Sequence, residues 1–283
     1  MKIKLTTDST CDLTPELIKR YEIAEAMPLP ISLGDRTLTD GAFDTREIYT
    51  HVEKTKQLPK TSAINVFDFE EMFAKHTADG SAVLHFSISS GVSACCQNAQ
   101  KAATGFKNVY VIDTKQLSTG TSLLIFYAYD LLKNNPQMTV QEAAGIMDIM
   151  TGKVQTSFCV DTITYLYKGG RCSALALLGS NLLKIHPSLH LKGGLIKVGK
   201  KYRGPMPSVI TRYIDDLKAE NPEYDDARCF ITYTPETDPE TVEAAKARTK
   251  QIFKFKEILE TTAGSTITSH CGKGTLGLLF LNK

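Results

Sequence analysis

The pattern of hydrophobic and polar positions along the chain changes at about residue 154. Before that point, short apolar runs alternate with longer segments that begin at residues typical of helix caps, among which Asp44-Thr45-Arg46-Glu47 and Thr139-Val140-Gln141-Glu142 are predicted capping boxes. The runs at 83–88 and 109–113 have the length and the β-leaning composition of buried strands. Alternation of such strands with helices predicts a parallel sheet covered on both faces. In this half we expect strands at 2–7, 83–88 and 109–113, an extended segment at 27–32, and helices at 15–21, 44–54, 67–75, from 94 onward, 118–132 and 140–150.

After residue 154 the pattern predicts antiparallel strands. The segment 189–198 carries two strand-like runs around Gly193-Gly194, which is typical of a hairpin. We therefore expect an α/β protein with two domains. Residues 1–154 form an α/β domain around a parallel sheet, and residues 155–283 form an α+β domain around a mainly antiparallel sheet. The other expected elements of the second half are strands at 156–160, 228–233 and 255–261, helices at 174–183, 208–219 and 239–253, and the segments 265–270 and 276–281, which complete the layer.

Composition and charge narrow the class of protein. Of the 283 residues, 42% are hydrophobic and 23% are charged, as in an ordinary globular protein. The net charge of +2 argues against the strongly basic surface of a nucleic-acid-binding protein. The seven cysteines form no C-x-x-C motif, which favours reduced thiols in a cytoplasm. The chain starts without an apolar signal core and has no run of about 18 apolar residues, so we expect a cytoplasmic protein without stable membrane insertion.

A serine-rich turn follows the predicted strand at 83–88 and precedes an alanine-rich segment that favours helix. Ser93 is expected to be the N-cap of that helix. Free N–H groups at a helix start, together with the serine hydroxyls, suit a carboxylate or a phosphate. A serine in this position is also commonly a cap and nothing more, so both interpretations stay open.

The same turn suggests an alternative function. Gly91-Val92-Ser93-Ala94-Cys95 differs only at its last residue, a cysteine in place of glycine, from the G-x-S-x-G turn that exposes the serine nucleophile of α/β-hydrolases. His270 could serve as the base, with Asp161 or Asp238 as the acid, in the chain order of those enzymes. An esterase with Ser93 as its nucleophile is therefore the alternative hypothesis.

Other candidate motifs are weaker when taken alone. Lys168-Gly169-Gly170-Arg171 lacks the spacing of a phosphate-binding loop. His186 and His190 are separated by Pro187, which argues against one helix face that presents both to a metal ion. The residues thus predict neither a nucleotide site nor a metal site.

Taken in order, the motifs resemble those of the DegV family of bacterial fatty-acid-binding proteins over nearly the whole chain. No single motif is specific, but the ordered set is. The set comprises Thr7-Asp8-Ser9-Thr10-Cys11-Asp12-Leu13, Pro28-Leu29 with Asp40-Gly41, Lys60-Thr61-Ser62, Ile88-Ser89-Ser90 with Ser93, Val111-Ile112-Asp113-Thr114 with Ser118, Tyr165-Leu166 with Gly169-Gly170-Arg171, and Ser269-His270 with Gly272 and Gly274.

The resemblance implies a lipid-binding protein without catalysis or a cofactor of its own. It would hold one long-chain fatty acid, such as palmitate or oleate, with the acyl tail in an apolar tunnel and the carboxylate between the domains. By the resemblance, Thr61 and Ser93 contact the carboxylate, His270 completes the network, Ser62 lies close by, and Arg171 lies near the same opening. A separate ATP-dependent fatty acid kinase would then phosphorylate the presented carboxylate.

Overall fold

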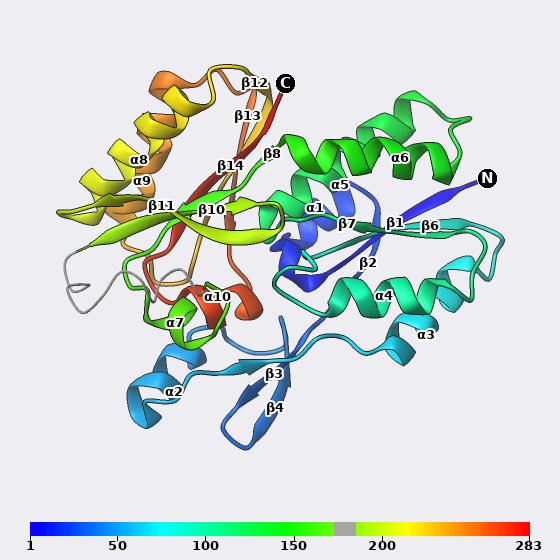
Figure 1. Ribbon diagram of the computed structural model, residues 1–283, viewed down its shortest axis with the longest axis horizontal. Coiled ribbons are helices and arrows are strands. Elements are labelled where there is room, and N and C mark those ends of the chain that lie inside the picture. The colour runs from blue at the N-terminus through cyan, green and yellow to red at the C-terminus, as the bar shows by residue number, and fades with distance from the viewer. Residues whose placement is uncertain (173–184) are drawn as a thin grey trace.

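The computed structural model describes residues 1–172 and 185–283, so the expected helix at 174–183 lies outside the described residues. Figure 1 shows two sheets side by side, one from each half of the chain. The first sheet has the strand order β2-β1-β6-β7, and every pair in it is parallel, as predicted. Its strands are β1 (Ile3–Asp8), β2 (Ile23–Met27), β6 (Ala82–Ser87) and β7 (Val109–Asp113).

Side chains that alternate along β6 explain why this sheet carries helices on both faces. Val83 belongs to a core cluster with α3 and α4, whereas Leu84 and Phe86 belong to a cluster with α5 and α6. Both faces of the strand are therefore buried, as its continuous apolar run predicted. The helices of this half are α1 (Pro15–Arg20), α2 (Glu47–Thr55), α3 (Val66–Thr77), α4 (Cys95–Ala103), α5 (Thr119–Asn134) and α6 (Val140–Met150), with the 3₁₀ turn η1 (Ser9–Cys11) after β1.

The second sheet has the order β11-β10-β9-β14-β12-β13, and β8 also pairs with β14. Its pairs are antiparallel except β12 with β13, which α9 connects as a parallel crossover. Helices α8 and α9 cover one face (Figure 1). The elements are β8 (Val154–Gln155), β9 (Ser157–Cys159), α7 (Thr164–Lys168), β10 (His186–Lys192), β11 (Leu195–Tyr202), α8 (Met206–Glu220), β12 (Tyr224–Tyr233), α9 (Pro239–Ile252), β13 (Glu257–Thr262), α10 (Ser265–Cys271) and β14 (Leu276–Asn282), with the 3₁₀ turn η2 (Thr151–Lys153) before β8.

Helix α5 packs between the two sheets and joins their cores. Phe126 on this helix lies with its ring centroid 5.6 Å from that of Phe230 on β12. Leu123 and Leu124 share one buried cluster with Leu84 of the first sheet and with side chains of the second. The two halves of the chain therefore bury a continuous apolar surface against each other.

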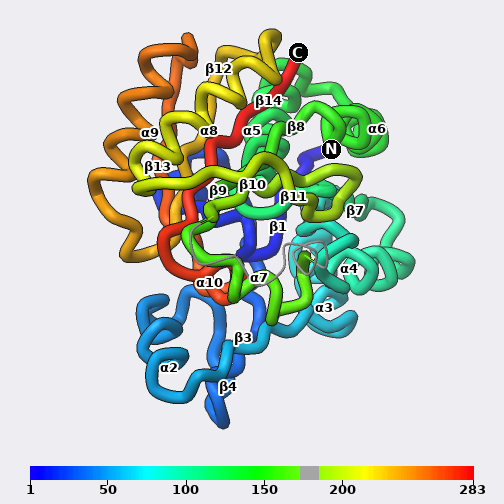
Figure 2. The backbone as a smooth tube through the Cα atoms, turned by 60° about the vertical axis from the view of Figure 1, so that its left-hand side comes forward, coloured from blue at the N-terminus to red at the C-terminus, as the bar shows by residue number. Residues whose placement is uncertain are grey.

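A third, small sheet was not predicted. It has the order β4-β3-β5 and consists of β3 (Pro30–Leu33), β4 (Arg36–Thr39) and β5 (Lys60–Thr61). The sequence predicted only an extended segment at 27–32, because a strand as short as β5 has no periodicity of its own and depends on its pairing with β3. Figure 2 shows this sheet with α2 as a separate layer next to α10.

Two local predictions are wrong for reasons that lie in side-chain hydrogen bonds. Asp44 does not form a capping box, because its carboxylate binds the backbone and the guanidinium of Arg46, and α2 begins only at Glu47. The segment 265–271, for which the sequence predicted no helix, forms α10, and the carboxyl groups of Asp12 and Asp40 accept hydrogen bonds from the amides at its start. No described helix has the length and apolar character that crossing a membrane requires.

Candidate functional site

All five predicted site residues line one cavity of about 190 Å³. Thr61 ends β5 and Ser62 follows it, Ser93 lies in the turn after β6, Arg171 follows α7, and His270 lies in the last turn of α10. The cavity thus combines residues from both halves of the chain. Apolar side chains make up much of the remaining wall, namely Leu29, Ile88, Val92, Leu117, Leu166, Ile196 and Ile267.

Carboxylates at the ends of two parallel strands hold the serine-rich turn in place. Asp8 at the end of β1 accepts hydrogen bonds from the Ile88 amide at 2.8 Å and from the Ser87 hydroxyl at 3.2 Å. Asp113 at the end of β7 accepts bonds from the Ser90 hydroxyl at 2.6 Å and from its amide at 3.1 Å. The polar residues at the carboxyl ends of these parallel strands therefore gather at one edge of the sheet.

Ser93 does not cap helix α4 as predicted. The helix begins at Cys95, and Ala94, which precedes it, makes no side-chain cap. The Ser93 hydroxyl instead accepts a hydrogen bond from the Cys95 amide at 3.2 Å. A hydroxyl that accepts one bond can still donate its proton, so Ser93 can donate to an anion in the cavity.

The hairpin of the second sheet closes over this turn. The Ser89 hydroxyl donates to the carbonyl of Gly194, at the tip between β10 and β11, at 2.7 Å. Gly91 packs directly beneath the same carbonyl, since a Cβ at this position would lie only 2.4 Å from the Gly194 oxygen. The turn and the hairpin therefore form one continuous wall, to which Ile196 contributes its side chain.

A hydrogen bond of 2.8 Å joins Thr61 Oγ1 to His270 Nε2 across the cavity lining. Strand β5 presents Thr61 through its pairing with Ile31 of β3, and the next amide, of Ser62, donates to the Pro30 carbonyl at 3.0 Å. Burial of the imidazole, together with the positive charge of Arg171, lowers the pKa of His270 to about 4. The ring is therefore neutral near pH 7 and carries one N–H.

The environment of the ring favours one tautomer. His270 Nδ1 is buried and has no hydrogen-bond partner among the residues that the structure describes. A buried N–H without an acceptor is more costly than an unpaired lone pair, so we assign the proton to Nε2. His270 then donates to Thr61 Oγ1, and the Thr61 hydroxyl keeps its own proton for another acceptor. The pair thus offers a donor to a ligand.

Arg171 gives the cavity a positive charge. Its guanidinium donates to the carbonyl of Gly169 at 2.7 Å. No acidic residue occurs among the described residues that line this cavity. Hydroxyl donors, a neutral histidine and an arginine next to an apolar wall suit a ligand that has an anionic head and a hydrocarbon tail. Within the described part of the chain no cluster of histidine, cysteine and acidic side chains could hold a metal ion.

The arrangement does not support the esterase hypothesis. Asp161 lies 3.4 Å from His186 Nδ1, and Asp238 accepts a bond from the Glu240 amide at the start of α9. Neither carboxylate orients His270, whose Nε2 binds Thr61. The described residues therefore do not form a Ser-His-Asp triad around Ser93.

Comparison with known proteins agrees with this geometry. The family model described as "Uncharacterised protein, DegV family" matches residues 2–283. The chain belongs to the DegV family.

Relatives in the DegV family include proteins whose names state a ligand. A Thermotoga maritima protein named fatty acid-binding protein is 29% identical, over 98% of this chain and 96% of its own. A solved DegV family structure from Thermus thermophilus, described by its fatty acid binding, has a TM-score of 0.90 and 26% identity, with both chains fully covered. A DegV lipid-binding protein from Thermotoga maritima has a TM-score of 0.86 and 28% identity, again over both whole chains.

Two further residues that support the cavity had no role assigned from the sequence. Asp12 and Asp40 accept hydrogen bonds from the Gly264 and Ser265 amides at the start of α10, the helix that carries His270. Both belong to the ordered motifs, but their partners are 252 and 225 positions away along the chain. A local sequence pattern carries no signal for a contact of that separation.

The tautomer of His270 is a direct prediction of this geometry. In ligand-free protein with ¹⁵N-labelled histidine, we expect long-range ¹H–¹⁵N spectra to show His270 protonated on Nε2 alone from pH 5.5 to 8. Its pKa of about 4 should leave the ring neutral over that range. The substitution Thr61→Val removes the hydroxyl that accepts the bond from His270, so it should change the Nε2 signal of His270. The control substitution His51→Ala should remove only the signal of a histidine outside the cavity. A proton on Nδ1 in the wild-type protein would contradict the assignment.

Proposed function

We propose that this protein binds one long-chain fatty acid, such as palmitate or oleate, with the carboxylate held between its two domains, residues 1–154 and 155–283. The observation that carries the proposal is that Thr61, Ser62, Ser93, Arg171 and His270 line one cavity with an apolar wall. The names of the DegV relatives that bind fatty acids support the choice of ligand. Seven buried cysteines suit the reducing cytoplasm as the place where the protein acts.

The tail provides most of the binding free energy in this proposal. Each buried methylene contributes about 0.8 kcal/mol, so a chain of many methylenes outweighs the head group. One hydrogen bond to the carboxylate contributes about 1 kcal/mol, and somewhat more when it involves a charge. The hydroxyls of Thr61 and Ser93 therefore act mainly to orient the acid, while Arg171 complements its charge.

We propose that the tail enters past Leu117 and Ile267. The described cavity of about 190 Å³ is smaller than the ~300–1,000 Å³ usual for ligand pockets. Leu117, Ile267 and Cys271 line both this cavity and a neighbouring one of about 30 Å³, next to Phe158 and Leu279. Displacement of these side chains would join the two spaces into a longer apolar channel.

We propose that the protein presents its bound acid to a separate ATP-dependent kinase and has no catalysis of its own. In that reaction a carboxylate oxygen attacks the γ-phosphorus of ATP, the bond to the β-phosphate oxygen breaks, and ADP leaves. The lack of a phosphate-binding loop motif in the sequence fits a reaction in which the partner binds ATP.

Hydroxylamine trapping tests this partnership. Palmitate-loaded protein incubated with ATP and a candidate fatty acid kinase should yield palmitoyl hydroxamate, because hydroxylamine captures the acyl phosphate. Neither protein alone should do so. Failure with every kinase subunit from the same cell would remove the presenting role but leave fatty acid binding untouched.

The ligand itself is tested by extraction. We expect mass spectrometry of an organic extract from the purified, denatured protein to show a long-chain fatty acid. Delipidated protein should regain thermal stability when palmitate or oleate is added, because a ligand that binds the folded state stabilises it. Absence of fatty acid from the extract together with an unchanged melting temperature would contradict the proposal.

Head-group variants test the residues. Ser93→Ala and His270→Ala should each weaken palmitate binding by about 1 kcal/mol, or roughly fivefold in Kd, because each removes one hydrogen-bonding group from the network. Ser208→Ala, an exposed serine on α8, and His51→Ala serve as matched controls and should bind as the wild type does. Unchanged affinity in both cavity variants would remove these residues from the site.

A further inference from the structure

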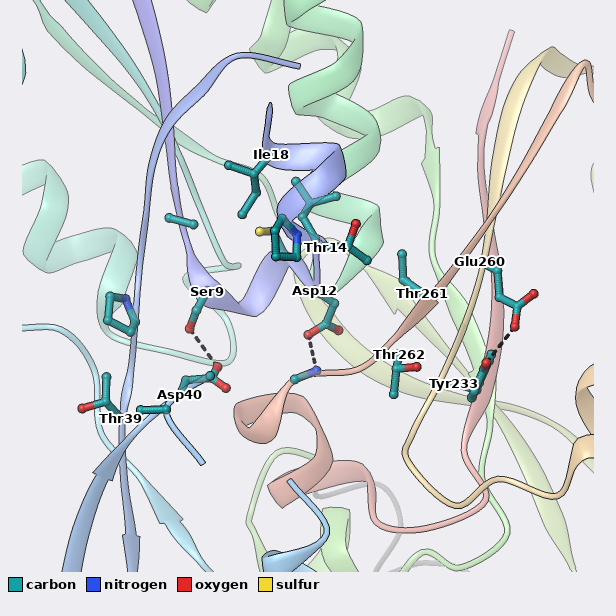
Figure 3. Close-up of a pocket in the computed structure, with 18 residues that line it drawn as sticks. Ser9, Asp12, Thr14, Ile18, Thr39, Asp40, Tyr233, Glu260, Thr261 and Thr262 are labelled. Carbon is teal, nitrogen blue, oxygen red and sulfur yellow. Dashed lines mark hydrogen bonds between the residues drawn. The ribbon is translucent and has the colours of Figure 1, made fainter. Parts of the chain in front are cut away.

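A second and larger cavity, of about 750 Å³, lies at the N-terminal end of α10 (Figure 3). One of its walls comes from the N-terminal half of the chain, including Ser9, Asp12 and Asp40. The opposite wall comes from the ends of β12 and β13. Asp12 and Asp40 are only 6% and 8% exposed, so these two carboxylates are part of the packed interior beneath the cavity.

The two carboxylates bind consecutive backbone amides at the start of α10. Asp12 Oδ1 accepts a bond from the Gly264 amide, and Asp40 Oδ1 accepts one from the Ser265 amide, each at 2.8 Å. Figure 3 shows the first of these bonds together with the bond from Ser9 to Asp40. Two donors that a helix start leaves unpaired are thus satisfied by side chains from the other half of the chain.

The second oxygen of each carboxylate is also bonded. The Ser118 hydroxyl donates to Asp12 Oδ2, and the Ser9 hydroxyl donates to Asp40 Oδ2 at 2.8 Å. The Ser265 hydroxyl makes a further contact of 2.8 Å with Thr45. Buried carboxylates persist where such bonds offset the loss of water, so their geometry is tightly determined.

The contact between Asp12 and α10 does not depend on the charge of the carboxyl group. Burial, with the neighbouring charges of Asp40 and Asp8, raises the pKa of Asp12 to about 8. A protonated carboxyl group keeps an oxygen that can accept the Gly264 amide. The bond therefore remains possible on both sides of neutral pH.

Because Gly264 has no side chain, the carboxyl groups of Asp12 and Asp40 can both lie close to the start of α10. A Cβ at this position would lie 3.2 Å from Asp12 Oδ1 and 3.3 Å from Asp40 Oδ1, closer than ordinary van der Waals contact. Its φ of −68° is accessible to any residue, so a side chain here would change only the spacing between the helix and the carboxylates.

The same short helix carries His270 at its other end. His270 lies five positions after Ser265, which is about 7.5 Å along a helix axis. Because the helix is continuous from Ser265 to His270, a shift at its first amides would move the imidazole relative to Thr61. Hydrogen bonds thus join α10 to the N-terminal half at its start, with Asp12, Asp40 and Thr45, and at its end, with Thr61.

We propose that Asp12 and Asp40 are positioning residues that act through α10. By holding the start of this helix against the N-terminal half of the chain, they set the place of His270 against Thr61 and so form the head-group end of the cavity. The consequence for fatty acid affinity rests on the proposed function, whereas the consequence for the His270 ring does not.

Two variants of Asp40 separate positioning from loss of stability. Asp40→Ala removes the acceptor for the Ser265 amide, and we expect it to shift the ¹⁵N signals of His270 in ligand-free protein and to weaken palmitate binding by about fivefold. Asp40→Asn keeps an acceptor for that amide and can donate to Ser9, so it should restore both properties. Thr139→Ala, which removes the cap of α6 far from either cavity, should reduce stability without changing His270.

Gly264→Ala gives an independent measurement if Asp40→Ala does not fold. This substitution keeps both aspartates, but its added methyl group should push the start of α10 away from their carboxyl groups. It should therefore shift the His270 signals as well. If Asp40→Ala and Gly264→Ala, or whichever of the two folds, leave the His270 signals unchanged, the proposal is overturned. If the wild-type protein binds no palmitate, the proposed function fails, but the His270 signals still decide the positioning role.

Discussion

The hydrogen bond between Thr61 and His270 is the interaction on which the rest of the cavity depends. It joins residues 209 positions apart, one on a two-residue strand and one on a seven-residue helix. Neither element has local strength of its own, because a short strand and a short helix form few internal hydrogen bonds. Each is held by partners elsewhere, β5 by β3 and α10 by Asp12 and Asp40. The site therefore exists only where the two halves of the chain meet.

The apolar wall and the polar end of the cavity have different roles in the proposed binding. In the proposed function, the apolar wall of the cavity would provide a nonspecific affinity for hydrocarbon, which grows with the area removed from water. The polar end is small, and its histidine is neutral, since burial and Arg171 lower its pKa. Donors that are already in place need little reorganisation when an anion arrives. In the proposed function, a carboxylate held in this way would keep its charge and be available to a partner's chemistry.

Particular elements show how far prediction from the sequence reaches. The parallel sheet, the hairpin around Gly193-Gly194 and the capping box at Thr139 are confirmed, because each depends on residues close together in the chain. The cap at Ser93 is wrong because the helix begins one residue later than predicted, and the capping box at Asp44 is wrong because that carboxylate binds Arg46. The family resemblance brought together the five site residues that the structure places around one cavity. Spacing along the chain could not have done so.

The sequence by itself determined the periodic elements, the parallel and antiparallel character of the two sheets, the family, and the residue types available for a head group. Only the tertiary structure decided that residues 265–271 form a helix, that β5 exists, and that Asp12 and Asp40 hold α10. The physical reason is the distance along the chain over which each interaction acts. Hydrophobic periodicity and capping act over a few residues, whereas the amides of α10 and the carboxyl groups that bind them lie 252 and 225 positions apart in the chain.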